Sequence, residues 1–184
     1  SWDTARTNRV GPPSLAFTNF PIRRQQLRLL NLVGAIIKAM IGLNHLVSHA
    51  SVAVAGTTSG EIGRGLMVLV AVHRDDQERD IERLAARILT YRVFPDDQDR
   101  MNRSLLDDNL GLLLVPQFTL TADTKKGTRA SFTKAAPPEM AEDYFRRLVE
   151  ACRQRLATVE TGQFGANMQV SLTNDGPVTF WLET

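Results

Sequence analysis

The apolar residues along the chain predict short strands in three places, with two amphipathic helices between them. Residues 41–47 are rich in apolar side chains, and residues 51–55 alternate between polar and apolar positions before the turn-forming residues 56–60. The run from Leu66 to Val72 is apolar throughout, as in a strand that is buried on both faces. We therefore expect residues 41–72 to be mainly strand.

The two predicted helices show apolar residues at spacings of three and four. The first begins near Asp75, because Glu78 three residues later can complete a capped start, and it is followed by a solvated loop from Pro95 to Asp99. The second begins at the prolines 137–138, since proline is tolerated in the first turn. The expected inner faces are Ile81, Leu84, Ala85, Ile88 and Leu89 in the first helix, and Ala141, Tyr144, Phe145, Leu148, Val149 and Cys152 in the second. The only cysteine is therefore predicted to lie in the core.

The remaining apolar segments predict further strands. Leu112 to Leu120 is a second continuous apolar run, and Pro116 within it marks an edge strand or a bulge. Residues 168–172 alternate, and Val178 to Leu182 reads as another strand after turn-forming residues. Because strands outnumber helices and do not alternate regularly with them, we predict an α+β fold with a curved sheet or partial β-barrel and two main helices.

The composition is that of an ordinary globular protein, with 184 residues of which 43% are hydrophobic and 23% charged. No window approaches the roughly 18 to 20 uninterrupted apolar residues of a membrane span, so we expect no membrane partner. A single cysteine excludes an internal disulfide and a thiolate zinc site. The single cysteine fits a reducing compartment, and we predict a cytoplasmic location.

The formal charge of +2 divides unevenly along the chain. Residues 1–39 contain six basic residues and one acid, so residues 40–184 hold 16 basic and 19 acidic residues and are net acidic. We therefore predict a basic N-terminal extension at 1–39 and a folded domain at 40–184. The extension resembles an organellar transit sequence, which makes an organellar location an alternative. We favour an unstructured or surface-docked extension, because transit peptides are normally removed.

The usual catalytic constellations are missing. His45, His49 and His73 are scattered, and the chain has no HExxH, GxSxG or glycine-rich phosphate loop. We therefore expect neither a metal nor a cofactor, and interpret the histidines as surface or hydrogen-bonded structural residues. An enzyme of this sequence must work through backbone groups, through a Thr or Gln side chain, or through its substrate.

Three segments stand out against this background, and each has a simpler structural explanation. Residues 115–120 place Pro, Gln and Thr in an apolar run, which a strand edge or bulge would explain. Residues 174–179 contain Asn, Asp and Gly, which a hairpin loop would explain. Residues 124–134 contain four basic residues and no acid, so they either bind a few phosphates or form a solvated loop.

Several long stretches between residues 40 and 184 match one known family in the same order. They are MIGLNHLVSHASVAV at 40–54, GEIGRGLMVLVAV at 60–72, YRVFPDD at 91–97, MNRS at 101–104, QFTLTADTKKG at 117–127, ASFTKAAPPE at 130–139 and TGQFGANMQVSLTNDGPVTFWLE at 161–183. These stretches resemble the D-aminoacyl-tRNA deacylases, homodimers that hydrolyse the ester between a D-amino acid and tRNA. Residues 1–39 lie outside the family pattern.

The family has two signature motifs, Ser-Gln-x-Thr and Asn-x-Gly-Pro-x-Thr, which fall here on residues 116–119 and 174–179. The resemblance implies a pocket at the subunit interface, built from the first motif of one subunit and the cis Gly-Pro of the other. It implies that this pocket takes the 3′ end of an aminoacyl-tRNA. The implied catalytic residues are Gln117, Phe118, Thr119, Gly176 and Pro177, the implied substrate-binding residues are Pro116, Phe164, Met168 and Asn174, and the candidates for tRNA phosphates are Lys125, Lys126 and Arg129.

Two positions depart from the family pattern. Pro116 replaces the serine of the first motif, and Leu46 replaces an arginine that is thought to hold the Gly-Pro loop. Both changes are reminiscent of a related animal deacylase with relaxed chirality, which removes L-alanine from a threonine tRNA. That relative has a different second motif, whereas residues 174–179 keep the D-specific form. The resemblance therefore predicts hydrolysis of D-aminoacyl-tRNA and of glycyl-tRNA mischarged on an alanine tRNA. The alternatives are a relaxed-chirality deacylase and a catalytically silent nucleic-acid-binding relative.

Overall fold

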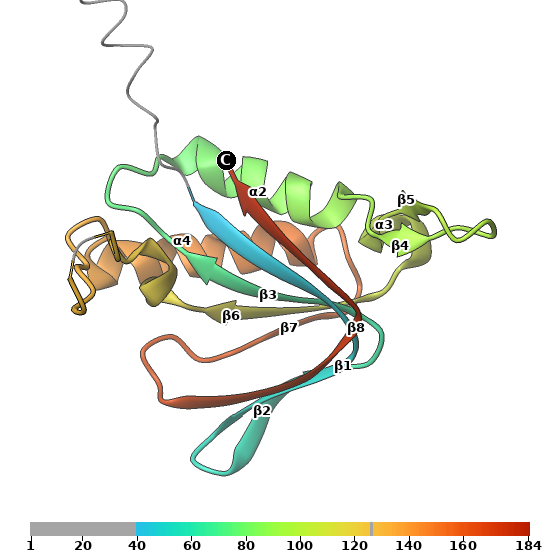
Figure 1. Ribbon diagram of the computed structural model, residues 1–184, viewed down its shortest axis with the longest axis horizontal. Coiled ribbons are helices and arrows are strands. Elements are labelled where there is room, and N and C mark those ends of the chain that lie inside the picture. Colours follow the sequence, from blue (N-terminus) through green and yellow to red (C-terminus); the bar gives the residue numbers. More distant parts are fainter. Residues whose placement is uncertain (1–39, 126) are drawn as a thin grey trace, which may run out of the picture. The chain divides into compact units, whose positions relative to one another are not determined.

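The computed structural model describes residues 40–125 and 127–184, and the predicted extension and Lys126 lie outside this part of the chain. One six-stranded sheet organises the described residues (Figure 1). Its order is β2-β1-β3-β6-β7, and β8 pairs with the other edge of β1. The strands are β1 (Ile41–Val54), β2 (Thr57–Ile62), β3 (Gly65–Ala71), β6 (Gly111–Pro116), β7 (Val159–Thr161) and β8 (Met168–Glu183).

The first strand curves the sheet because it changes partner along its length. Residues 41–47 of β1 pair with β3, whereas residues 50–54 pair with β2. On its other side β1 pairs antiparallel with β8 along both halves, so β1 and β8 run together through the bend (Figure 1). The pairs β3–β6 and β6–β7 are parallel, which makes the sheet mixed. The predicted α+β fold with a curved sheet is confirmed, although β1 is one strand rather than two.

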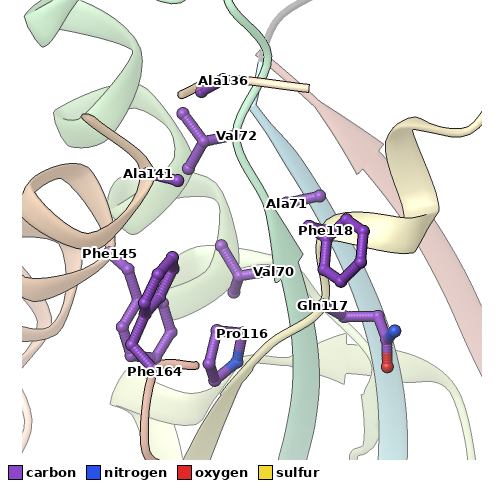
Figure 2. A pocket seen from close by; sticks show the side chains of 10 residues that line it. All are labelled: Val70, Ala71, Val72, Pro116, Gln117, Phe118, Ala136, Ala141, Phe145 and Phe164. Atoms are coloured by element: carbon purple, nitrogen blue, oxygen red, sulfur yellow. The ribbon is translucent and has the colours of Figure 1, made fainter. Parts of the chain in front are cut away.

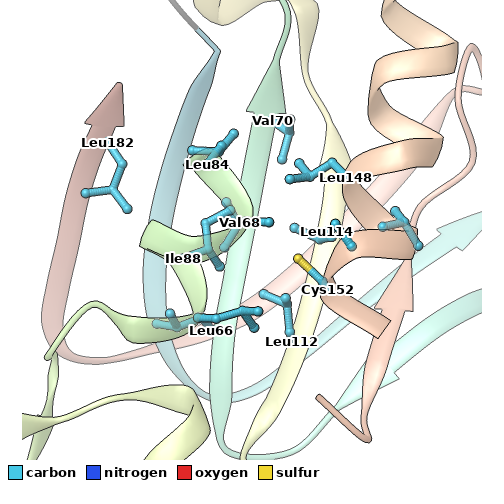
Figure 3. Close-up of a cluster of buried hydrophobic side chains, with 14 of the residues drawn as sticks. Leu66, Val68, Val70, Leu84, Ile88, Leu112, Leu114, Leu148, Cys152 and Leu182 are labelled. Atoms are coloured by element: carbon cyan, nitrogen blue, oxygen red, sulfur yellow. The ribbon is translucent and has the colours of Figure 1, made fainter. Parts of the chain in front are cut away.

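Two helices, α2 (Glu78–Thr90) and α4 (Pro138–Arg153), cover one face of the sheet (Figures 1 and 3). Their apolar faces are buried as the spacing predicts, except that Tyr144 is only half-buried. Cys152 lies in this core, where burial raises the pKa of its thiol to about 12, so its predicted place is confirmed. A smaller apolar cluster, which includes Val47, Met67 and Val115, lies on the other face.

The start of α2 differs from the sequence prediction, whereas the solvated loop after the helix is confirmed. The helix is capped by Gln77 and Asp80, not by Asp75 and Glu78. The Asp80 carboxylate accepts the Gln77 N–H at 2.9 Å, which satisfies a backbone donor that the helix itself cannot. The acidic residues after Pro95 form the tip of a small hairpin between β4 (Phe94–Pro95) and β5 (Met101–Arg103), followed by the one-turn helix α3 (Leu105–Asp108).

Two strand predictions are also wrong. Pro116 marks neither an edge strand nor a bulge, because β6 lies between β3 and β7 and Pro116 is its last residue. The next N–H group, of Gln117, still donates to the Val70 carbonyl at 2.7 Å, after which the chain turns into the 3-10 helix η1 (Phe118–Thr121). Residues 174–177 are not a hairpin loop but part of the continuous strand β8. No helix in the described part of the chain is long and apolar enough to cross a membrane.

Candidate active site

A pocket of about 500 Å³ opens where β6 ends. Pro116, Gln117 and Phe118 form one side of it, and Phe164 and Met168 form another. These five predicted site residues therefore come together, although 46 positions separate the two groups along the chain. Their side chains leave a mostly apolar cavity with room for a planar ring.

A smaller recess adjoins this pocket on the side of the helices (Figure 2). It shares Pro116, Gln117, Phe118 and Phe164 with the larger pocket and reaches Val70 and Phe145. In Figure 2 the Phe145 and Phe164 rings lie against each other beside Pro116, whereas the Gln117 amide points away from them. Pro116 thus supplies an apolar wall where the family resemblance expects a hydroxyl.

The polar groups of the first motif gather at the start of η1. The Gln117 amide donates to the Thr119 hydroxyl, and the Thr121 hydroxyl donates to the Phe118 carbonyl at 2.8 Å. Phe118 and Thr119 are the first two residues of η1, so their N–H groups have no acceptor within the helix. This arrangement offers two backbone donors beside the pocket.

The second motif forms a bulge in β8. Residues 175–178 stand opposite the single residue Leu46, between the pairs Val47–Asn174 and His45–Thr179. The Gly176–Pro177 peptide bond is cis, as the family resemblance implies. Gly176 has φ of 133°, and a Cβ there would lie 2.5 Å from Val178 Cγ2, so this position requires glycine.

The side chain of Asn174 holds this bulge closed. Its Oδ1 accepts the Val178 N–H at 2.8 Å, and its Nδ2 donates to the Thr179 hydroxyl at 2.9 Å. Asn174 therefore supports the bulge, and its predicted part in substrate binding stays a prediction. None of Asn174, Gly176 and Pro177 lines the pocket formed by the first motif of the same chain.

His45 completes this network, a role that its place in the sequence did not reveal. Its Nδ1 lies 3.0 Å from the Thr179 hydroxyl oxygen. Because that oxygen already accepts a hydrogen from Asn174, its own hydrogen is available to His45. Burial lowers the pKa of His45, which favours the neutral ring, whose unprotonated Nδ1 can accept this hydrogen.

The other two histidines and Leu46 lie outside the polar network. His49 is exposed and contacts Glu61 at 2.8 Å, and His73 is buried after β3. Leu46 is buried in the core beside the helices, and its aliphatic side chain can make no hydrogen bond to the bulge. The interpretation of the histidines as hydrogen-bonded residues is confirmed for His45 and His49.

The basic segment forms a loop that closes on Asp123. A backbone bridge joins Asp123 to Ser131, and the Asp123 carboxylate accepts from Lys134 at 2.8 Å. This bond to Lys134 lowers the pKa of Asp123. Lys125 and Arg129 are exposed on the loop beyond this closure, and Lys126 lies outside the described residues.

Within the described ranges, no three His, Cys, Asp or Glu side chains gather in a way that could hold a metal ion.

A family model described as D-Tyr-tRNA(Tyr) deacylase matches residues 45–183. The chain belongs to this family. The resemblance found in the sequence is therefore confirmed.

Two bacterial relatives agree with this membership, and a solved structure shows a similar fold. The D-aminoacyl-tRNA deacylase of Alkalilimnicola ehrlichii is 58% identical over 144 residues, which cover 78% of this chain and 96% of that protein. The enzyme of the same name from a Janthinobacterium strain is 55% identical, with 78% and 97% covered. The solved structure of the c-Myc DNA Unwinding Element Binding Protein superposes with a TM-score of 0.75 at 36% identity, covering 78% of this chain and 98% of that one.

Proposed function

We propose that this protein hydrolyses the ester bond of D-aminoacyl-tRNA and releases the free D-amino acid and tRNA. The proposal rests chiefly on the pocket at the end of β6, where Gln117 and Phe118 of the deacylase motif meet Phe164 and Met168. Thr119 of the same motif follows directly in η1. Two bacterial relatives that are more than half identical to this chain are named D-aminoacyl-tRNA deacylase. A cytoplasmic location, where tRNA is charged, fits this activity.

The chemistry needs no side-chain nucleophile. An aminoacyl ester is already activated, and the N–H groups of Phe118 and Thr119 stabilise the developing oxyanion, each donor contributing roughly 10²–10³ in rate. The terminal ribose hydroxyl of the tRNA helps to position or activate water. Thr119 is not a nucleophile, because its hydrogen-bond partner is the Gln117 amide, and an amide cannot act as a general base.

The active site is completed by a second subunit. Gly176 and Pro177 are exposed and do not line the pocket of their own chain. In a homodimer the Gly176–Pro177 bulge of one subunit covers the pocket of the other. Its carbonyls then face the α-carbon of the aminoacyl group and exclude an L side chain.

Selectivity against L-residues comes from this steric wall. A 10⁴-fold rejection corresponds to about 5.5 kcal/mol, which a clash with backbone supplies and a lost methyl contact does not. Glycine has no side chain to clash, so glycyl-tRNA mischarged on an alanine tRNA is a substrate as well. The pocket takes the terminal adenosine between Phe164 and Met168, and Lys125, Lys126 and Arg129 contact phosphates.

The test is release of amino acid from D-Tyr-tRNA, L-Tyr-tRNA and Gly-tRNA by the full chain. We expect rapid release from the D-ester and the glycyl ester and none above background from the L-ester. Release from both tyrosyl esters would support ester hydrolysis but contradict selectivity for D-residues, as in a relaxed-chirality deacylase. No release from any of them with enzyme in excess would contradict the proposal.

A second candidate function is nucleic-acid binding without catalysis. It is favoured by Pro116 and Leu46, which replace two family residues, and by the structural similarity to a protein named for binding a DNA unwinding element. Tight binding of uncharged tRNA or DNA combined with absent turnover would favour this candidate over the first.

A further inference from the structure

Two exposed aromatic rings lie against each other beside the pocket. The ring centroids of Phe118 and Phe132 are 5.3 Å apart and the rings are tilted by 56°. Phe118 is 58% exposed and Phe132 is 42% exposed. Phe118 also lines the pocket, so this pair continues the pocket wall onto the surface.

Hydrogen bonds of the basic loop hold Phe132 in this place. The bridge between Asp123 and Ser131 closes the loop on one side of Phe132. On the other side, the Ala135 N–H donates to the Phe132 carbonyl at 3.0 Å and the Ala136 N–H donates to Val72 at 3.0 Å. The exposed ring is therefore anchored at both ends and does not sit on a free loop tip.

The groups follow one another in the order that a single-stranded RNA end requires. Phe118 lines the pocket together with Phe164 and Met168, and its ring also contacts Phe132. The exposed Lys125 and Arg129 lie on the loop between the two phenylalanines in sequence. Aromatic surfaces combined with basic groups that follow the backbone are the usual means of binding single-stranded nucleic acid. A pair of rings without such charges nearby would suit a protein partner equally.

We propose that Phe118 and Phe132 form a stacking surface for the base that precedes the terminal adenosine of the tRNA. This inference rests on the proposed function, because it requires the terminal adenosine to occupy the adjoining pocket. The surface binds the penultimate base by its face, while Lys125 and Arg129 neutralise the phosphates that lead to it. It contributes to binding, whereas the backbone N–H groups of η1 act on the ester.

Truncated substrates test this inference. The D-tyrosyl esters of adenosine, of the dinucleotide CA and of full-length tRNA are compared for kcat/KM with the wild-type protein and with Phe132→Ala. We expect the variant to lose roughly 10-fold or more on CA and on tRNA, mainly in KM, because one base–aromatic stack is removed. The adenosine ester, which has no second base, is expected to react at the wild-type rate.

Two matched variants complete the experiment. Phe132→Trp keeps an aromatic face and is expected to retain most of the activity on CA and tRNA. Met101→Ala removes an equally exposed apolar side chain on β5, away from the pocket, and is expected to change nothing.

Each other outcome has a distinct meaning. An equal loss on all three substrates, or no loss on any, would overturn the stacking surface, as would dissociation of a dimer by Phe132→Ala. Wild-type protein that hydrolyses none of the three esters would instead contradict the proposed function itself.

Discussion

His45 is the residue whose role depends most on its surroundings. It accepts a hydrogen bond from Thr179, which is itself held by Asn174, so it supports the bulge that carries Gly176 and Pro177. The Asn174 amide nitrogen, a donor, lies 3.5 Å from Nδ1, so an unprotonated Nδ1 suits this network best, and a protonated ring would direct a hydrogen toward that amide.

We predict that the deacylation rate falls on the acid side and that His45 is the cause. The pKa of His45 is lowered from 6.5, so the fall begins below that pH, as the ring gains its proton. His45→Gln can still accept from Thr179 and does not titrate, so it is expected to remain active and to lose this acid limb. His45→Leu is expected to be at least about 10-fold slower at every pH, because the bond is gone.

Rates measured between pH 5 and 8, corrected for spontaneous hydrolysis, check this prediction. His49→Gln is the matched control, since His49 lies on the same strand but contacts only the exposed Glu61. An unchanged acid limb in His45→Gln would assign the titration to another group.

At the scale of elements, the junction between β3 and α2 contains a carboxylate that is costly to bury. Asp76 is 5% exposed, its Oδ2 accepts the His73 N–H at 2.7 Å, and its Oδ1 has no hydrogen-bond partner within the described ranges. Burial, with a smaller contribution from the nearby Asp80 and Asp75 carboxylates, raises the pKa of Asp76 to about 7 despite the lowering effect of the His73 bond.

This raised pKa predicts that stability falls as pH rises from about 4 to about 7. In that window the unfolded chain releases the proton of Asp76, while the folded chain retains it, so ionisation favours unfolding. The full effect is on the order of 4 kcal/mol, because each unit of pKa corresponds to about 1.4 kcal/mol. Asp76→Asn cannot ionise and is expected to flatten this dependence.

Denaturant unfolding of the wild type and Asp76→Asn at pH 4.5, 6 and 8 measures the effect. The stability difference between them should move in favour of the variant as pH rises. Asp97→Asn, at an exposed position in the turn between β4 and β5, serves as the control and should follow the wild-type curve. Parallel curves for wild type and Asp76→Asn would show that Asp76 ionises freely in the folded protein.

Elements also show where local sequence is misleading. Asn174, Asp175 and Gly176 have the composition of a hairpin turn, yet they lie within the strand β8. The strand continues because β1 supplies hydrogen-bond partners on both sides of the bulge, from Val54 to His49 and from His45 to Ile41. Turn-forming residues allow the chain to leave the strand pairing, but residues distant in sequence determine whether the pairing resumes.

At the scale of the whole molecule, β8 presents apolar side chains that a single chain leaves uncovered. Val170 is 37% exposed, Leu172 is 38% exposed and Trp181 is 48% exposed. An apolar strand surface of this kind is costly in water and favours contact with another subunit. It lies on the same strand as the Gly176–Pro177 bulge, as the proposed interface active site requires.

We predict that two inactive variants restore activity when they are combined. Gln117→Ala damages the pocket, and Gly176→Ala damages the bulge, because no Cβ fits at that position. In a mixed dimer, one of the two sites joins an intact pocket to an intact bulge of the other chain. Co-expression should therefore recover about a quarter of the wild-type activity, since half of randomly formed dimers are mixed.

Sedimentation and activity of the co-expressed pair check this prediction, with each variant alone as the control. A monomer in solution, or a mixture as inactive as its components, would contradict an active site shared between subunits.

The sequence by itself determined the family, both motifs and the inner faces of α2 and α4, with Cys152 among them. These features are local in sequence. The family and its motifs follow from the order of residues, and the helix faces follow from apolar residues spaced three and four apart, as in any helix that packs on an apolar core. It also placed Pro116 to Phe118 and Phe164 to Met168 in one site, but only through the family resemblance.

The tertiary structure alone decided how these segments meet. The His45–Thr179 bond joins residues 134 positions apart, and the Phe118–Phe132 contact depends on a backbone bridge that closes the loop between them. Neither contact leaves a periodic trace in the sequence, because each is created by strand pairing and loop closure between residues that are distant or irregularly spaced. The same long-range pairing made β8 one strand and made residues 175–178 its bulge.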